Sequence, residues 1–188
     1  MNYADIKYCD VANGEGVRVS LFVSGCTHHC KECFNKEAWD FHYGNPFTQK
    51  EIDRILEYLK PNYIAGLSLL GGEPMEPVNQ EGILPLLRAV KQTYPEKNIW
   101  CYTGYLFDKD VLDKMCKESE VTKEIVSYLD IVVDGEFMID RKNLKINFRG
   151  SDNQRIIDVK KTLDAGEIVH WEREIPVSYT HLRAHETS

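Results

Sequence analysis

Three cysteines within eight residues are the side chains of this chain best suited to chemistry. Cys26, Cys30 and Cys33 follow the spacing CxxxCxxC. A structural zinc site normally takes four ligands, whereas this local set stops at three. Three thiolates can hold three irons of a cubic [4Fe-4S] cluster and leave the fourth iron open for reaction. The count therefore favours a reactive iron–sulfur site, and a zinc site completed by His28, His29 or a remote cysteine is the alternative.

A polar turn with the sequence GGEP occupies residues 71–74, directly after a short apolar run. Two glycines let the backbone approach a ligand closely, and exposed amide and carbonyl groups can grip a charged amino-acid moiety. The Glu73 carboxylate can accept a hydrogen bond from an ammonium group. A motif of this kind alone is typical of an ordinary turn.

Taken together, the cysteine spacing and the GGEP turn resemble the signature of the radical S-adenosylmethionine (SAM) superfamily. This resemblance implies one [4Fe-4S] cluster whose open iron is chelated by SAM, and cleavage of SAM by an electron from the cluster. It implies cluster ligation by the three cysteines. The SAM contacts that we expect are Gly71, Gly72, Glu73, Glu32, Thr103 and Asp134. Glu32 stands where the superfamily often has an aromatic residue, so its adenine contact is expected to be made by the backbone.

The resemblance narrows to one family when shorter motifs are read in order. They are NGEGVR at 13–18, FVSGC at 22–26, CFN at 33–35, WCYTG at 100–104, VDG at 133–135 and RGSDNQR at 149–155. This combination resembles the anaerobic ribonucleoside-triphosphate reductase activating proteins. A departure is Glu136, which follows Asp-Gly where that family frequently has proline.

Membership of that family would imply a glycyl-radical activase. The enzyme would cleave SAM to a 5′-deoxyadenosyl radical and abstract a glycine Cα hydrogen from the large subunit of the reductase. A flavodoxin or ferredoxin would supply the electron, and no acid–base residue beyond the cofactor ligands is expected to be catalytic. Two other functions remain open, namely a radical SAM enzyme acting on a small molecule and a zinc-binding interaction module.

Length and composition place limits on these functions. The chain has 188 residues and a net charge of −7, without a basic run typical of nucleic-acid binding. No apolar segment predicts a signal peptide or a membrane span. Six cysteines without a secretion signal predict a cytoplasmic protein. We expect Cys9, Cys101 and Cys116 to be small packed residues rather than further ligands.

Strand and helix patterns alternate along the chain. Strands are expected at 18–23, 67–70, 98–103 and 129–133, because these runs are rich in β-branched, aromatic or apolar residues. A capping box, Thr48 to Glu51, predicts a helix that ends before Pro61. Apolar stripes predict further helices at 83–94, with Pro85 in the first turn, and within 111–128.

Alternating strands and helices predict an α/β fold with parallel strands and the site at their carboxyl ends. The units are too few for a closed eight-stranded barrel, so we expect a partial, open (β/α) barrel of the radical SAM type. Four loops then meet at one rim: the cysteine loop, the GGEP turn, Thr103 with Gly104, and Asp134 with Gly135. Residues 1–176 are expected to form this domain. Residues 177–188 lack an apolar period and resemble a non-native read-through tail.

Overall fold

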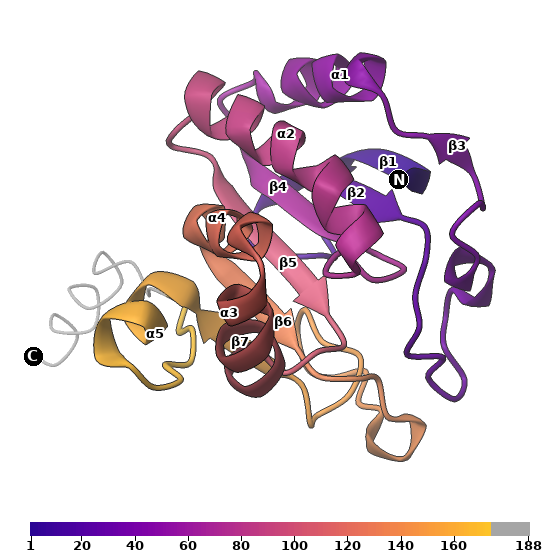
Figure 1. Ribbon diagram of the computed structural model, residues 1–188, viewed down its shortest axis with the longest axis vertical. Helices are drawn as coiled ribbons and strands as arrows, with labels where there is room; N and C mark the ends of the chain where they lie inside the picture. Colours follow the sequence, from indigo (N-terminus) through magenta and orange to yellow (C-terminus); the bar gives the residue numbers. More distant parts are fainter. Residues whose placement is uncertain (174–188) are drawn as a thin grey trace, which may run out of the picture.

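The computed structural model describes residues 1–173, which form one twisted sheet with helices packed against it (Figure 1). The predicted tail at 177–188 lies outside the described residues. The strands are β1 (Asn2–Asp10), β2 (Val17–Val23), β3 (Asn45–Pro46), β4 (Ile64–Gly71), β5 (Asn98–Thr103), β6 (Ile131–Asp134) and β7 (Arg155–Asp158). The longer helices are α1 (Gln49–Leu59), α2 (Pro77–Thr93), η2 (Phe107–Met115), α4 (Glu120–Tyr128) and α5 (Val159–Ala165). Short turns of helix are η1 (Lys36–Trp39), α3 (Cys116–Glu118) and η3 (Ile139–Arg141).

The sheet has the strand order β3-β1-β2-β4-β5-β6-β7. Its centre, β2-β4-β5-β6, is parallel, as expected for βα units. The outer strands β1, β3 and β7 pair antiparallel and were not predicted. The α/β class is therefore confirmed, and within residues 1–173 the sheet does not close into a barrel.

Most of the predicted elements are present. The capping box of α1 forms, with the Thr48 amide donating to the Glu51 carboxylate at 2.7 Å, and the helix ends before Pro61. The expectation for Pro85 was wrong, because α2 begins at Pro77 and Pro85 lies inside the helix. The first N–H groups of a helix have no partner within the helix, so a proline such as Pro77 is favoured at its start. The apolar stripe begins later than Pro77, and the helix start predicted from that stripe was therefore too late.

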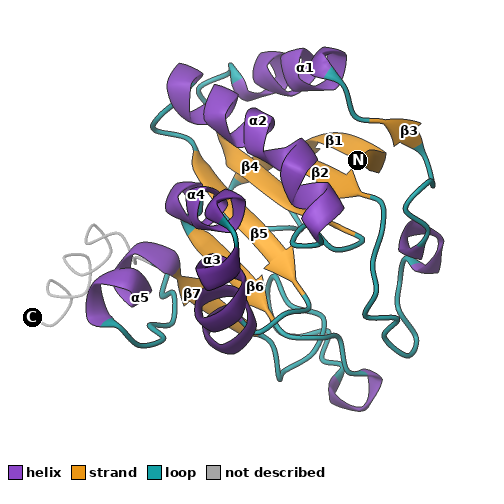
Figure 2. Cartoon of the chain, in the orientation of Figure 1, coloured by secondary structure: helices purple, strands orange, loops and turns teal. Residues whose placement is uncertain are grey.

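The two faces of the sheet are covered differently. Figure 2 shows α1, α2 and α4 lying over one face, where the main apolar core forms. Alternation along β5 sends Ile99 and Cys101 into that core and Trp100 to the opposite face. There Trp100 packs edge-on against Phe148 and Trp171, which belong to irregular segments. Loops rather than helices therefore cover the second face.

The other three cysteines take different environments. Cys101 is buried in the main core and Cys116 is partly buried, in line with the expected packing role. The expectation for Cys9 was wrong, because its side chain is exposed. Cys9 has a φ of 60° where the register of β1 against β2 shifts, so the irregularity places it outside the core.

Among the described residues, no helix has both the length and the apolar character needed to cross a bilayer.

Candidate functional site

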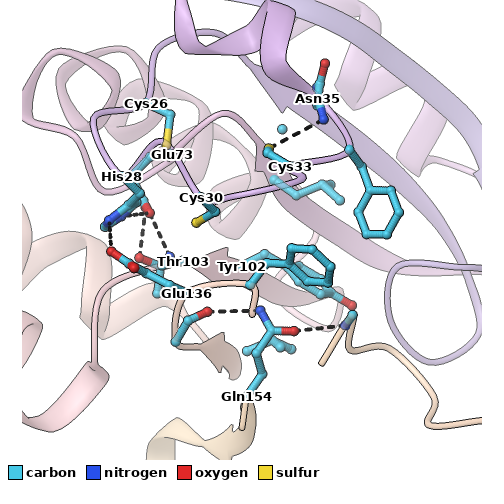
Figure 3. A pocket seen from close by; sticks show the side chains of 18 of the residues that line it. Cys26, His28, Cys30, Cys33, Asn35, Glu73, Tyr102, Thr103, Glu136 and Gln154 are labelled. Carbon is cyan, nitrogen blue, oxygen red and sulfur yellow. Dashed lines mark hydrogen bonds and ion pairs between the residues drawn. The ribbon is translucent and has the colours of Figure 1, made fainter. Parts of the chain in front are cut away.

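The cysteine loop begins directly after β2 and runs along one wall of a cavity of about 490 Å³. Cys26, Cys30 and Cys33 all line this cavity, and each is a free thiol (Figure 3). The loop is tightly wound, since His29 and Glu32 have φ values of 51° and 56°. Such left-handed residues cost free energy and are often concentrated at functional sites.

The chemistry of this donor set fits an iron–sulfur cluster, because three thiols face one cavity and leave room beside them. Within residues 1–173, no three Cys, His, Asp or Glu side chains converge as a site for a single metal ion. Burial raises the pKa of the Cys26 thiol to about 11 and also raises that of Cys30. These pKa shifts disfavour a role for either thiol as a free nucleophile.

The GGEP turn packs directly against the base of the cysteine loop. Gly71 has a φ of 106°, which favours glycine. A Cβ atom on Gly72 would lie 2.6 Å from the carbonyl oxygen of Gly25 and 2.8 Å from that of Ala38. The Glu73 amide in turn donates to the Gly25 carbonyl at 2.8 Å. Only a glycine pair therefore lets the β4 turn and the cysteine loop approach this closely.

The Glu73 carboxylate holds three segments together: its own turn, the loop after β5 and the cysteine loop. It is 1% exposed and accepts hydrogen bonds from the Met75 amide at 2.8 Å and the Thr103 hydroxyl at 2.8 Å. It also accepts from the Gly104 amide at 2.7 Å and pairs with His28 Nε2 at 2.7 Å. Four partners occupy the four acceptor positions of a carboxylate. Glu73 is thus engaged by the protein itself and not free to accept from a ligand.

His28 joins the cysteine loop to two carboxylates. Its Nε2 atom contacts Glu73, and its Nδ1 atom lies 3.0 Å from Glu136 Oε1 (Figure 3). Burial alone would lower the pKa of His28, but the hydrogen bonds and charges of the two glutamates raise it above its usual value. The ring also packs edge-on against Tyr105 at 4.4 Å. His28 therefore connects the cysteine loop to the loops after β4 and β6.

Two predicted cofactor contacts do not line the cavity. Asp134 is fully buried and accepts from the Phe107 amide at 2.8 Å and from Arg155 Nε at 3.0 Å. Its carboxylate therefore joins β6 to β7 and to η2. Glu32 is exposed and also lies outside the lining. Gly71, Gly72, Glu73 and Thr103 line the cavity, and their contact with SAM stays a prediction.

A further wall comes from the segment between β6 and β7. Gln154 binds across this segment, because its Oε1 accepts from the Gly150 amide at 2.9 Å and its Nε2 donates to the Gly135 carbonyl at 2.9 Å (Figure 3). Arg149 also lines the cavity. Both residues belong to the RGSDNQR motif, and neither was predicted to lie in the site. The motif was the one sequence signal that could have pointed to these residues. The local pattern of residues could not predict that this segment lies against the cavity.

Three buried polar atoms of the cavity-lining residues have no hydrogen-bond partner within residues 1–173. They are Trp39 Nε1, the Tyr102 hydroxyl and Arg149 Nε. An unpartnered buried polar group is costly, so an occupant that supplies acceptors would be favoured here. Burial also raises the pKa of Tyr102, which keeps its hydroxyl protonated as a donor.

Comparison with known proteins places this arrangement among iron–sulfur proteins. Residues 12–157 match the family described as 4Fe-4S single cluster domain. The chain is 40% identical over 158 residues to the anaerobic ribonucleoside-triphosphate reductase-activating protein of Pasteurella multocida, covering 83% of this chain and 96% of that protein. The protein of the same name from Enterobacteria phage T4 is 43% identical, with 83% and 93% covered. That of Escherichia coli K12 is 38% identical over 156 residues, with 82% and 96% covered.

Proposed function

The chain belongs to the family of anaerobic ribonucleoside-triphosphate reductase-activating proteins, and we propose that it forms a glycyl radical on the large subunit of that reductase. The observation that carries the proposal is the shared cavity: Cys26, Cys30 and Cys33 line it together with the GGEP turn. When bound, a [4Fe-4S] cluster and SAM would supply the electron and the 5′-deoxyadenosyl radical that removes a glycine hydrogen. The protein itself positions and shields these groups.

The three cysteines would each hold one iron of the cluster. The backbone of Gly71 and Gly72 would hold the amino end of SAM, because their close packing leaves the turn no freedom to move away. Thr103 would lie beside the amino end of SAM. Glu73 would hold the GGEP turn, the loop after β5 and the cysteine loop in fixed positions relative to one another. The Tyr102 hydroxyl and Arg149 would offer donors to an occupant of the cavity.

Membership of this family implies a more specific description of the fold. The parallel strands β2, β4, β5 and β6 with their helices would be the partial (β/α) barrel of the radical SAM type. A protein partner would approach the open rim of that barrel. An electron donor such as flavodoxin or ferredoxin would be needed, and a reducing cytoplasm would keep the thiols available for the cluster.

Anaerobic reconstitution with iron and sulfide tests the proposal. The protein should become brown, and addition of reductant and SAM should release 5′-deoxyadenosine. With its cognate reductase it should give a glycyl radical doublet in the electron paramagnetic resonance spectrum. A reductase with alanine at the target glycine is the control and should give no doublet. A colourless protein holding one zinc ion, or SAM cleavage coupled only to a small molecule, would contradict the proposal.

A further inference from the structure

The mouth of the cavity carries an aromatic pair from two distant parts of the chain. Phe34, which directly follows Cys33, and Phe137, which follows β6, have ring centroids 5.0 Å apart. Both residues line the cavity, and Phe34 is nevertheless 72% exposed. A large aromatic ring therefore stands in solvent at the edge of the site.

The same edge has further exposed apolar side chains. Met138 is exposed next to Phe137, and Leu144 is 86% exposed. Leu144 lies between Lys142, whose Nζ is 5.1 Å from the Phe34 ring centroid, and Ile146, which lines the cavity. Single exposed apolar residues are common on protein surfaces, but a group bordering a cavity marks a binding surface. We call Phe34, Phe137, Met138 and Leu144 the rim patch.

The charge around the rim patch is mixed. The exposed carboxylates of Glu136 and Asp140 flank Phe137 and Met138, whereas the stretch that carries Leu144 is basic, with Arg141 paired to Asp152. Residues 141–149 contain four basic side chains and no carboxylate, although the chain has a net charge of −7. An approaching segment that is neutral or acidic would therefore meet no like charge from this stretch.

We propose that the rim patch docks the segment of the reductase that carries the target glycine, by covering an apolar side chain next to that glycine. This inference rests on the proposed function and specifies how the partner is recognised. Glycine has no side chain, so its neighbours must supply the apolar contact that holds it at the cavity. The patch is continuous with the cavity lining through Phe34 and Phe137, so a segment bound there would present its backbone to the cavity.

The test compares Leu144→Asp with Leu163→Asp, a matched change of an exposed leucine on α5. Leu144 is exposed and distant in sequence from the cysteines, so cluster absorbance and SAM cleavage without reductase should match the wild type. The KM for the cognate reductase in glycyl radical formation should rise about tenfold, equivalent to about 1.4 kcal/mol. The kcat should be retained, and Leu163→Asp should behave as wild type.

An unchanged KM in Leu144→Asp would overturn the inference. So would a change in self-association without a change in KM, because the patch would then be a contact between two copies. A reductase with serine in place of the apolar neighbours of its glycine should show the raised KM with the wild-type protein and little further effect of Leu144→Asp. If the wild-type protein formed no glycyl radical at all, the proposed function would fail first, and the two failures are thus distinguishable.

Discussion

Replacing Glu73 with glutamine should destabilise the protein even without any cofactor. The side chain keeps its shape, but one carboxylate oxygen becomes an amide group that only donates. If the amide replaces Oε1, it faces the Met75 amide, and if it replaces Oε2, it faces the Gly104 amide. Thr103 and His28 can turn or change tautomer to accept. A backbone amide cannot, so either orientation leaves one buried N–H group without an acceptor.

The size of the effect follows from these contacts. A buried donor without a partner costs about 1–3 kcal/mol, and the remaining hydrogen bonds lose the extra strength that a charged acceptor gives. Relief from burying a charge offsets part of this loss. We expect unfolding free energy to fall by about 3 kcal/mol. For a chain of this length each kcal/mol lowers Tm by about 2–4 °C, so Tm should fall by roughly 6–12 °C.

Urea unfolding of the cluster-free protein, followed by circular dichroism under reducing conditions, measures this difference. Glu120→Gln is the control, because that carboxylate is 87% exposed and pairs only with Lys123 across one turn of α4. Its loss should cost less than about 0.5 kcal/mol. If Glu73→Gln unfolded like the control but no longer bound SAM, the carboxylate would be a ligand contact rather than a structural one.

Three further predictions concern the cluster, acid stability and the chain end. Cys30→Ala should abolish cluster absorbance and SAM cleavage, whereas Cys101→Ala should keep the cluster spectrum; a stable cluster in Cys30→Ala would contradict the ligand assignment. Burial raises the pKa of Asp10, but hydrogen bonds from Ser20, Asn13 and the Ala12 amide lower it below its usual 3.8. The wild type should therefore be more stable than Asp10→Asn above pH 3.8, and it should lose this advantage as the pH falls through the lower pKa of the folded protein. Urea midpoints of both proteins, measured across the acid range, test this prediction. A difference in midpoint that does not change with pH would refute it. A chain ending at Pro176 should keep the Tm and activity of the full chain, and a large loss of Tm would show that the end is integral.

The central part of the site was predictable because its signals are local. The cysteine spacing and the GGEP turn each follow a strand with a recognisable apolar pattern. Parallel strands bring their carboxyl ends to one edge, so two such turns on β2 and β4 must meet when those strands are neighbours. The common direction of parallel strands therefore predicted a contact between the cysteine loop and the GGEP turn, which are far apart in sequence.

The partners of the acidic residues were not predictable in the same way. Asp134 was expected near the cofactor because it follows a parallel strand, but β7 pairs antiparallel with β6 and brings Arg155 directly opposite. Strand β7 has only four residues, a weak pattern for assigning a strand or its direction. A carboxylate at a strand end can serve a ligand or a neighbouring strand, and only the pairing decides between them.

The distribution of these contacts argues for a large rather than a small substrate. Glu73 and His28 fasten the floor of the site through short, buried hydrogen bonds, so the part proposed to hold SAM is rigid. The rim patch, with Phe34 and Leu144, is exposed to solvent. An enzyme for a small molecule gains by surrounding it, since pockets usually bury most of a small ligand. A rigid floor beside an exposed apolar edge instead suits a partner protein, which brings its own surface to cover that edge and exclude water when its glycine enters.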